Sequence, residues 1–217
     1  MKMFSLSVFL LVVAFPLLGA AADLEPGFVS LFDGKTLAGW EGKPQVFRVE
    51  EGAIVAGSAT ERVPQNEFLA TEKKYENFEL RLDTKLVGKG DNAGIQFRSE
   101  RIPNHHEVLG YQCDMGFAGP RPIWGSLYDE SRRKDFLAHG DAVSVGKALK
   151  KEDWNTFVIR CEGPHIQIWL NGVATVDYTE KDAKIARTGI IALQIHGGEP
   201  AVAYYRNVRI KELPAAK

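Results

Sequence analysis

The sequence predicts an all-β protein, a sandwich of two antiparallel sheets, and three observations carry that prediction. Apolar and polar residues alternate with period two through much of the chain, for example over residues 78–83, 157–161 and 166–170. Glycine and proline separate these runs. Helical patterns are scarce, and only 148–153 and 178–186 are candidates for a turn or short helix. Many short strands without an internal repeat are typical of a sandwich or jelly roll.

The first 22 residues have the layout of a secretory signal peptide. Lys2 is followed by an apolar run over 4–18 and then by small residues at 19–22. The run is shorter than the roughly 20 residues that cross a bilayer, and no cysteine follows it for a lipid anchor. We therefore expect cleavage after Ala22, an exported chain in the periplasm or outside the cell, and no transmembrane segment afterwards.

Residues 23–217 are expected to form a single domain, because no composition shift or linker divides them. Removing residues 1–22 takes away one charged side chain, Lys2, and changes the net charge from −1 to about −2. A near-neutral chain without a basic stripe argues against nucleic-acid binding. Partners are therefore expected to be selected by shape and hydrogen bonding.

Two cysteines, Cys113 and Cys161, are the only ones in the chain. An oxidising compartment would allow one disulfide between them. Both lie in strand-like runs, where a free cysteine is commonly a small buried apolar residue. The pattern favours core packing over a disulfide.

Two connections are informative. Asn171-Gly172 separates two strand-like runs and predicts a two-residue hairpin with a type I′ turn, so Asn171 is expected to be structural. Residues 115–147 are rich in glycine and proline and include Tyr128 and the basic cluster 132–134. A connection this long inside a domain is usually functional.

Three predicted strands each carry a pair of polar side chains on the face opposite the apolar residues. Sugar hydroxyls both donate and accept hydrogen bonds, and planar multidentate groups suit them. The sequence therefore predicts a concave binding face, with an ordinary solvated face as the alternative. Glycines beside these residues are expected to let a ligand approach the backbone. The pairs are Gln96 and Arg98, Gln112 and Asp114, and Gln194 and His196, and the glycines are Gly94, Gly110, Gly189, Gly197 and Gly198.

Metal, nucleotide and serine-hydrolase motifs are absent from the sequence. No C-x-x-C, H-E-x-x-H or EF-hand pattern occurs, and neither does G-x-S-x-G or a phosphate-binding glycine loop. Adjacent histidines at 105 and 106 would point to opposite faces of a strand. A mixed site that uses His196, Asp114 or Glu107 stays open. No cofactor is certain, and a divalent cation is compatible with the sequence.

Residues 27–40 resemble the opening "LFDGKTLDGW" of the 3-keto-disaccharide hydrolase domain family, formerly a domain of unknown function. Further similar motifs follow in order and extend the resemblance over roughly residues 27 to 213. They are Asn92–Arg98, Gly110–Asp114, Gly125–Glu130, Trp154-Asn155, Leu170–Gly172, Leu193–His196 and Tyr205–Val208. The resemblance implies a concanavalin A-like jelly roll of two curved antiparallel sheets and action on glycosides oxidised at C3. The E-x-D-x-x-E motif of laminarinase-type glycosidases is absent, which disfavours hydrolysis by two carboxylates.

Cleavage of a 3-keto-glycoside requires a base for the C2 proton, donors for the enolate oxygen and an acid for the leaving group. His196 is the first candidate for the base, because imidazole titrates near neutral pH, and Asp114 is the alternative. Gln96, Arg98, Gln112 and Gln194 are candidates to donate hydrogen bonds to the enolate oxygen and to bind the sugar hydroxyls. Tyr128 is expected to shield the sugar or to donate a proton.

Two other functions stay open. One is a non-catalytic, lectin-like carbohydrate-binding module, in which Trp40 and Trp124 would stack on sugars, with Trp154 and Trp169 more suited to packing. The other is a structural envelope protein, which would expose an apolar patch. A titratable group deep in the groove, surrounded by donors, would favour the enzyme.

Overall fold

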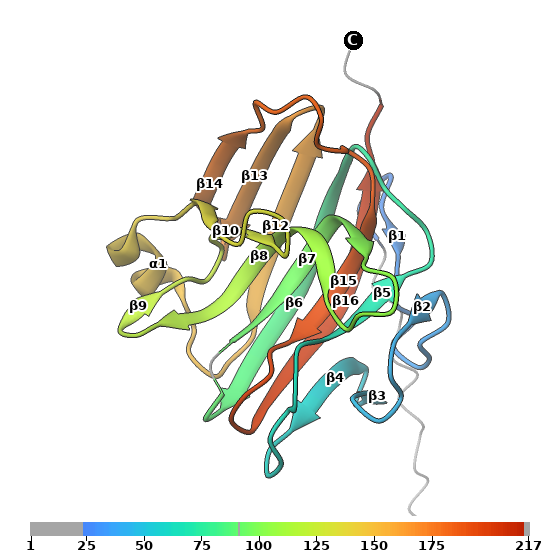
Figure 1. The fold of residues 1–217 in the computed structure, drawn as a ribbon, viewed down its shortest axis with the longest axis vertical. Coiled ribbons are helices and arrows are strands. Elements are labelled where there is room, and N and C mark those ends of the chain that lie inside the picture. The colour runs from blue at the N-terminus through green and yellow to red at the C-terminus, as the bar shows by residue number, and fades with distance from the viewer. Residues whose placement is uncertain (1–23, 91, 215–217) are drawn as a thin grey trace, which may run out of the picture.

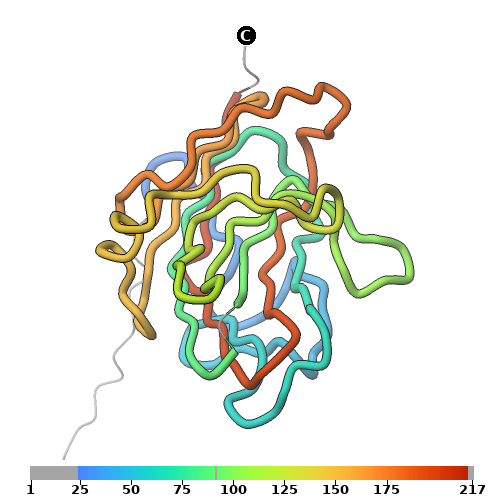
Figure 2. Tube along the Cα trace, turned by 60° about the vertical axis from the view of Figure 1, so that its left-hand side comes forward, coloured from blue at the N-terminus to red at the C-terminus, as the bar shows by residue number. Residues whose placement is uncertain are grey.

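Strand pairing gives two antiparallel sheets of eight strands each, layered face to face as a sandwich (Figures 1 and 2). The computed structural model describes residues 24–90 and 92–214, so the predicted signal peptide lies outside the described residues. The first sheet has the order β14-β13-β12-β6-β16-β4-β3, with β1 on β16, and the second has the order β11-β10-β8-β7-β15-β5-β2, with β9 on β8. The predicted all-β jelly-roll class is confirmed.

The element bounds are β1 (Val29–Ser30), β2 (Trp40–Glu41), β3 (Phe47–Glu50), β4 (Ala53–Ser58), β5 (Glu67–Thr71), β6 (Phe78–Gly88), β7 (Asn92–Arg101), β8 (Val108–Ala118), β9 (Arg121–Pro122), β10 (Leu127–Glu130), β11 (Phe136–Ala138), α1 (Ala142–Ala148), β12 (Asn155–Glu162), β13 (His165–Leu170), β14 (Val173–Thr179), β15 (Ile190–Ile195) and β16 (Ala201–Glu212).

The main core fills the space between the sheets. Alternation directs Phe78, Leu80 and Leu82 of β6 inward, and Ile95 and Phe97 of β7 meet them from the second sheet. Cys113 and Cys161 are buried in this core with free thiols, as the packing interpretation predicts. Burial raises the pKa of the Cys161 thiol to about 12, so this sulfur is not a reactive thiolate.

The long segment 115–147 is not an irregular connection. It contains the end of β8, the strands β9, β10 and β11, and the helix α1, which Asp141 caps by accepting from the Ser144 amide at 2.9 Å. Of the two segments where a turn or short helix was expected, 148–153 begins at the last residue of α1 and continues as turns, and 178–186 contains the end of β14 and a turn. Among the described residues, no helix is long and apolar enough to cross a membrane.

The predicted hairpin at Asn171-Gly172 is confirmed. Both residues have positive φ, 48° and 84°, as a type I′ turn requires, and they join β13 directly to β14. The Asn171 side chain also accepts from the Thr156 amide at 2.8 Å and donates to the Ala148 carbonyl at 2.8 Å. Asn171 therefore forms the turn and also links it, through its side chain, to β12 and to the end of α1.

The hairpin between β7 and β8 bends toward β15 and β5 on the outer face of the second sheet (Figure 1). A register shift between Phe97 and Glu100 produces the bend. Arg101 donates to the Phe68 carbonyl at 3.0 Å and so ties the hairpin to β5. Val108 packs in a small apolar cluster with Phe68 and with three residues of the neighbouring strands: Ala70, Ile190 and Ala192. This hairpin, residues 99–109, helps to bury the outer face.

Candidate functional site

Four of the predicted site residues lie together on the outer face of the second sheet. Gln96 of β7 is the register partner of Gln112 of β8, and Gly94 lies between Gln194 of β15 and Asp114 of β8. Residues paired across antiparallel strands share a face. All four polar side chains are buried, with exposed fractions between 0% and 2%. The predicted face is therefore a buried polar cluster and not an open solvated surface.

The cluster contains a continuous chain of hydrogen bonds. Gln112 Nε2 donates to Asp114 Oδ1 at 2.5 Å, and Gln96 Nε2 donates to Gln112 Oε1 at 2.6 Å. Ser99 Oγ donates to Gln96 Oε1 at 2.9 Å. The carboxyl of Asp114 is thus the last acceptor in a chain that runs from the Ser99 hydroxyl through the Gln96 and Gln112 amides, and all of these groups are buried.

Burial controls the protonation of Asp114. Removal from water raises the pKa of its carboxyl to about 8, against the hydrogen bond from Gln112, which favours the ionised form. The charge of Glu130 raises the pKa of Asp114 further. A perturbed carboxyl of this kind points to a functional site.

Gln194 differs from the other two amides. Its side chain is fully buried, yet neither Nε2 nor Oε1 has a hydrogen-bond partner within the described part of the chain. Buried amides are almost always paired, so an unpaired one indicates a place that a ligand or water occupies. Gln194 is separated from Asp114 only by Gly94, which has no side chain.

The segment 126–139, which contains β10 and β11, adds three residues that the sequence analysis did not single out: Ser126, Phe136 and His139. Ser126 lies opposite Asp114, whose backbone amide donates to the Ser126 carbonyl at 3.0 Å. Ser126 Oγ lies 3.0 Å from His139 Nδ1, and burial lowers the pKa of His139. Phe136 packs against His139 with ring centroids 4.4 Å apart and against Tyr128 at 5.0 Å. The half-buried rings of Tyr128 and Phe136 and the exposed ring of His139 border the cluster beside Gln112, the register partner of Tyr128.

Two further carboxyls lie near this border. Burial, and then the charge of Glu107, raise the pKa of Glu130. Glu107 belongs to the bent hairpin and accepts from Asn66 Nδ2 at 3.0 Å, which joins the hairpin to the start of β5. Burial raises the pKa of Tyr128, and the negative charges of Glu130 and Asp114 raise it further.

His196 lies one residue beyond the end of β15 and is exposed. Its Nδ1 is 2.6 Å from the Gly197 carbonyl, which can only accept, so Nδ1 carries a proton and donates to this carbonyl. His196 lines a pocket of about 280 Å³ together with Lys89, Asn92 and Glu199. By strand geometry it lies about 7 Å along β15 from Gln194.

Arg98 is not part of this cluster, and the prediction that it shares the face is wrong. The bulge in β7 gives Arg98 a φ of 48° and breaks the alternation. Its guanidinium donates to the Glu76 carbonyl at 2.8 Å and to the Gly163 carbonyl at 2.7 Å, and lies 3.3 Å from Asn77 Oδ1. Arg98 therefore joins the second sheet to the end of the first.

The glycines beside the cluster mainly make room for the protein itself and not for a ligand. A Cβ on Gly94 would lie 2.6 Å from Gln112 Cδ. A Cβ on Gly110 or Gly189 would collide with Ser99, and one on Gly197 would lie 2.7 Å from the Cα of Gln65. Only at Gly198 does such an atom meet open space.

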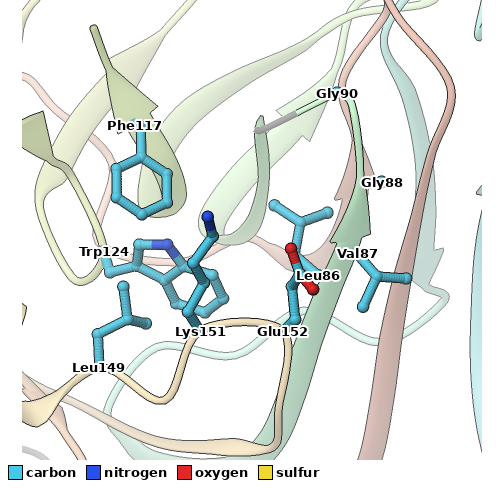
Figure 3. A pocket seen from close by; sticks show the side chains of 9 residues that line it. All are labelled: Leu86, Val87, Gly88, Gly90, Phe117, Trp124, Leu149, Lys151 and Glu152. Carbon is cyan, nitrogen blue, oxygen red and sulfur yellow. The ribbon is translucent and has the colours of Figure 1, made fainter. Parts of the chain in front are cut away.

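A second cavity, of about 40 Å³, opens between the sheets and is separate from the polar cluster. Figure 3 shows Trp124 between Phe117 and Leu149, facing Leu86 of β6. Trp124 also stacks on Phe157 in the core, with ring centroids 6.1 Å apart.

The tryptophans proposed as stacking platforms for a lectin are largely structural. Trp124 and Trp40 are buried, and Trp40 donates to the Leu31 carbonyl at 2.6 Å. The Arg206 guanidinium lies 3.8 Å from the Trp154 ring centroid. Stacking on Trp40 or Trp124 is therefore excluded by burial.

Within residues 24–90 and 92–214, no three His, Cys, Asp or Glu side chains are grouped closely enough to hold a metal ion. The divalent cation that the sequence leaves open has no ligand set in that part of the chain.

Solved structures of other proteins share this sandwich fold. A protein of Parabacteroides distasonis ATCC 8503, described as a proposed glycosyl hydrolase, superposes with a TM-score of 0.63 at 19% identity and covers 87% of this chain and 94% of its own. The carbohydrate-binding module CBM66 of Bacillus subtilis gives a TM-score of 0.57 at 13% identity over 80% of this chain and 96% of its own. At these identities the likeness shows the fold, a jelly roll shared with sugar-binding and sugar-cleaving proteins.

Residues 27–211 match the profile of the 3-keto-alpha-glucoside-1,2-lyase-like domain, and the chain belongs to this family. A curated relative, the 3-keto-disaccharide hydrolase of Bacteroides thetaiotaomicron, is 32% identical over 84 residues. That match covers 35% of this chain and 29% of the relative, less than a third of its length. The resemblance deduced from the sequence motifs is confirmed.

Proposed function

We propose that this protein cleaves glycosides whose sugar carries a ketone at C3, by elimination across C1 and C2 followed by addition of water. The observation that carries the proposal is the buried carboxyl of Asp114. It accepts a hydrogen bond from Gln112, and the unpaired side-chain amide of Gln194 lies on the other side of Gly94. A base works best when its pKa is near the operating pH, and burial raises that of Asp114 to about 8. A protein that only binds sugar needs no such group.

The ketone makes the reaction accessible to a carboxylate. It acidifies the proton on C2, and the base removes this proton while the electron pair forms an enolate with negative charge on the C3 oxygen. When the C3 carbonyl re-forms, a double bond forms between C1 and C2 and the bond from C1 to the leaving oxygen breaks. The leaving oxygen takes up a proton, and water then adds to C1. The site must therefore stabilise an oxyanion and handle two protons.

Each step has a candidate residue. Ionised Asp114 takes the C2 proton. Gln194 Nε2, buried and unpaired, donates to the enolate oxygen, where a preorganised donor is worth most. His196, in the adjoining pocket, delivers a proton to the leaving oxygen from Nε2. Gln96 and Gln112 are already engaged with each other, so we assign them to support of Asp114 and not to the substrate.

Carbohydrate binding without catalysis is the second candidate. It is favoured by the half-buried rings of Tyr128 and Phe136 and the exposed ring of His139, because aromatic faces commonly pack against sugars. These rings also fit the enzyme, in which they would hold the sugar beside Asp114. The two functions differ in whether Asp114 turns substrate over.

We also propose that the protein acts outside the cytoplasm. The charged residue at position 2, the apolar run over 4–18 and the small residues at 19–22 support this proposal.

Incubation of residues 23–217 with a chromogenic 3-keto-glucoside and with the unoxidised glucoside tests the function. We expect release of the aglycone from the 3-keto compound only, and in D₂O we expect deuterium at C2 of recovered substrate or product. Binding of the 3-keto compound without aglycone release would establish the carbohydrate-binding function instead. Aglycone release without deuterium at C2 would contradict the enolate.

A further inference from the structure

We infer that Ser99, Gln96 and Gln112 form a reversible amide relay, which lets Asp114 gain or lose a proton inside the protein while every member of the chain stays hydrogen-bonded. Its catalytic consequence rests on the proposed function, in which Asp114 is the base. The relay itself is a property of the folded protein and needs no substrate.

The observed orientation suits an ionised carboxylate. A carboxylate can only accept, and Gln112 donates to it. That leaves Gln112 Oε1 to accept from Gln96, and Gln96 Oε1 to accept from Ser99. In all three hydrogen bonds the donor lies farther from Asp114 than the acceptor. Each bond therefore polarises the next, and together they stabilise the negative charge of the carboxylate.

The reversed orientation suits a protonated carboxyl. The oxygen and nitrogen of an amide differ little in size, so a flip of each amide exchanges its donor and acceptor ends. Asp114 would then donate to Gln112 Oε1, Gln112 Nε2 to Gln96 Oε1, and Gln96 Nε2 to Ser99 Oγ. The Ser99 proton has another acceptor available, because Oγ lies 3.0 Å from the Phe97 carbonyl. Ser99 can therefore end the chain in either direction, as a hydroxyl both donates and accepts.

Packing restricts the relay to these flips. The absence of a side chain at Gly94 leaves room for Gln112, and Gly110 and Gly189 leave room for Ser99. Gln96 and Ser99 have no exposed surface, and Gln112 is 2% exposed. Water cannot readily replace a lost partner at such positions, so an unpaired end would be costly. The sequence-predicted glycines thus serve the relay.

Several titratable groups face Asp114 from the surrounding elements. Glu130 and Tyr128 act from β10, and Cys113 precedes Asp114 on β8 with a thiol that burial keeps neutral. Glu107 of the hairpin raises the pKa of Glu130, and His139 lies against Ser126, the residue opposite Asp114. From β15, Gln194 is uncharged and His196 lies beyond the strand end. None of them hydrogen-bonds to Gln96, which makes Gln96 a specific reporter of the relay among the described residues.

NMR titration of the side-chain amides of uniformly ¹⁵N-labelled protein, with the Asp114 carboxyl followed by ¹³C, tests the relay. We expect the Gln96 amide to shift with the same midpoint as the Asp114 carboxyl, although the two side chains share no direct hydrogen bond. Asp114→Asn should abolish the Gln96 titration. Thr84→Val, which removes a buried hydroxyl of β6 that makes no hydrogen bond in the described chain, should leave it unchanged.

A Gln96 amide that stays constant while Asp114 titrates would overturn the relay, and so would an Asp114 that stays in one protonation state from pH 4 to 10. Gln112→Leu adds a second measurement: Gln96 should become insensitive to pH. The Asp114 midpoint should rise by about 1–2 pH units, because the ionised form loses a charge-assisted hydrogen bond. A coupled titration in a protein that cleaves no 3-keto-glycoside would retain the relay and reject the function. Turnover of a 3-keto-glycoside without a coupled titration of Gln96 and Asp114 would retain the function and reject the relay.

Discussion

The hydroxyl of Tyr205, in β16 of the first sheet, donates to the backbone carbonyl of Gln194, in β15 of the second sheet, at 2.5 Å. The same oxygen lies 3.3 Å from the Gly94 carbonyl. Tyr205 is fully buried, so this contact crosses the core between the sheets. The Tyr205 hydroxyl thus holds the backbone of Gln194, whose side-chain amide is unpaired, and the backbone of the neighbouring Gly94. This contact fixes the backbone beneath the candidate site.

Tyr205→Phe is expected to lower the free energy of unfolding by about 1–3 kcal/mol, because it removes a buried hydrogen bond without changing the shape of the ring. Urea denaturation measures the loss. Tyr204→Phe is the matched control: Tyr204 is half-buried, its hydroxyl makes no hydrogen bond in the described chain, and its ring packs on Trp154. Equal losses in the two variants would contradict the role of the Tyr205 hydroxyl.

Asp114→Asn is expected to change how stability depends on pH. The pKa of Asp114 is raised to about 8 in the folded protein, above its ordinary value of 3.8. Between these values the unfolded chain has released the proton and the folded chain retains it. The stabilising contribution is therefore complete below about pH 4 and is lost as the pH rises through 8, with a slope of up to about 1.4 kcal/mol per pH unit.

Urea titrations at pH 5, 6, 7 and 8 of the wild type and of Asp114→Asn measure that slope. The difference in unfolding free energy between the two proteins should change steadily with pH in favour of the variant at the alkaline end. A difference that is constant across this range would show that Asp114 has an ordinary pKa.

Arg98 is expected to matter for stability and not for substrate binding. Its buried guanidinium has two backbone carbonyl acceptors and Asn77, and burial lowers its pKa. Arg98→Ala should lower the unfolding free energy by about 3 kcal/mol or more, because the acceptors lose their partner. Arg98→Gly should be less harmful by roughly 1 kcal/mol, since glycine adopts the positive φ of this bulge without strain.

Thermal and urea unfolding of both variants measure this difference. If Arg98→Lys were fully stable but had lost affinity for a 3-keto-glycoside, the sequence-based substrate-binding role would be restored.

The sequence predicted what depends on local periodicity. Alternation in β7, β8 and β15 placed Gln96, Gln112, Asp114 and Gln194 on one face, because the phase of a strand is a local property. The turn at Asn171-Gly172 was predictable for the same reason. Arg98 was misplaced because one bulge inverts the phase, and nothing in residues 97–100 marks that bulge.

What the sequence missed depends on contacts between distant segments. The bend of the 99–109 hairpin onto Phe68 helps to bury the outer face, and no alternation pattern contains this bend. Ser126 and His139 meet the cluster only because β10 pairs with β8 and β11 with β10. One signal was available: Ser126 lies in the family-like motif 125–130, and His139 precedes a glycine in the same segment 115–147.

Asn171→Ala is expected to lower the unfolding free energy by about 1–3 kcal/mol and to leave kcat unchanged. The variant loses the αL preference of asparagine and the bonds to Thr156 and Ala148. Asn171→Gly separates these contributions, because it keeps the turn backbone and loses only the bonds. A stable Asn171→Ala variant without turnover would contradict the turn assignment.

The roles of Asp114 and His196 are separable by the choice of leaving group. Proton abstraction from C2 is needed for every 3-keto-glycoside, so Asp114→Asn should lower kcat by about 10²–10⁴-fold for both a nitrophenyl and an alkyl glycoside. A nitrophenolate leaves without a proton, whereas an alkoxide needs one. His196→Ala should therefore reduce kcat strongly for the alkyl glycoside and little for the nitrophenyl glycoside.

The pH dependence supplies the control for this assignment. If Asp114 is the base, kcat of the wild type for the nitrophenyl glycoside should rise with pH and level off above about 8, because the carboxylate form is the active one. His196→Ala should keep that profile, since His196 does not act on this substrate. If instead His196→Ala lost turnover of both glycosides while Asp114→Asn retained it, the base would be His196 and Asp114 would serve binding. Should both variants keep normal kcat on both substrates, the reacting sugar would have to lie against Glu130 and Glu107 at the hairpin and not against Asp114.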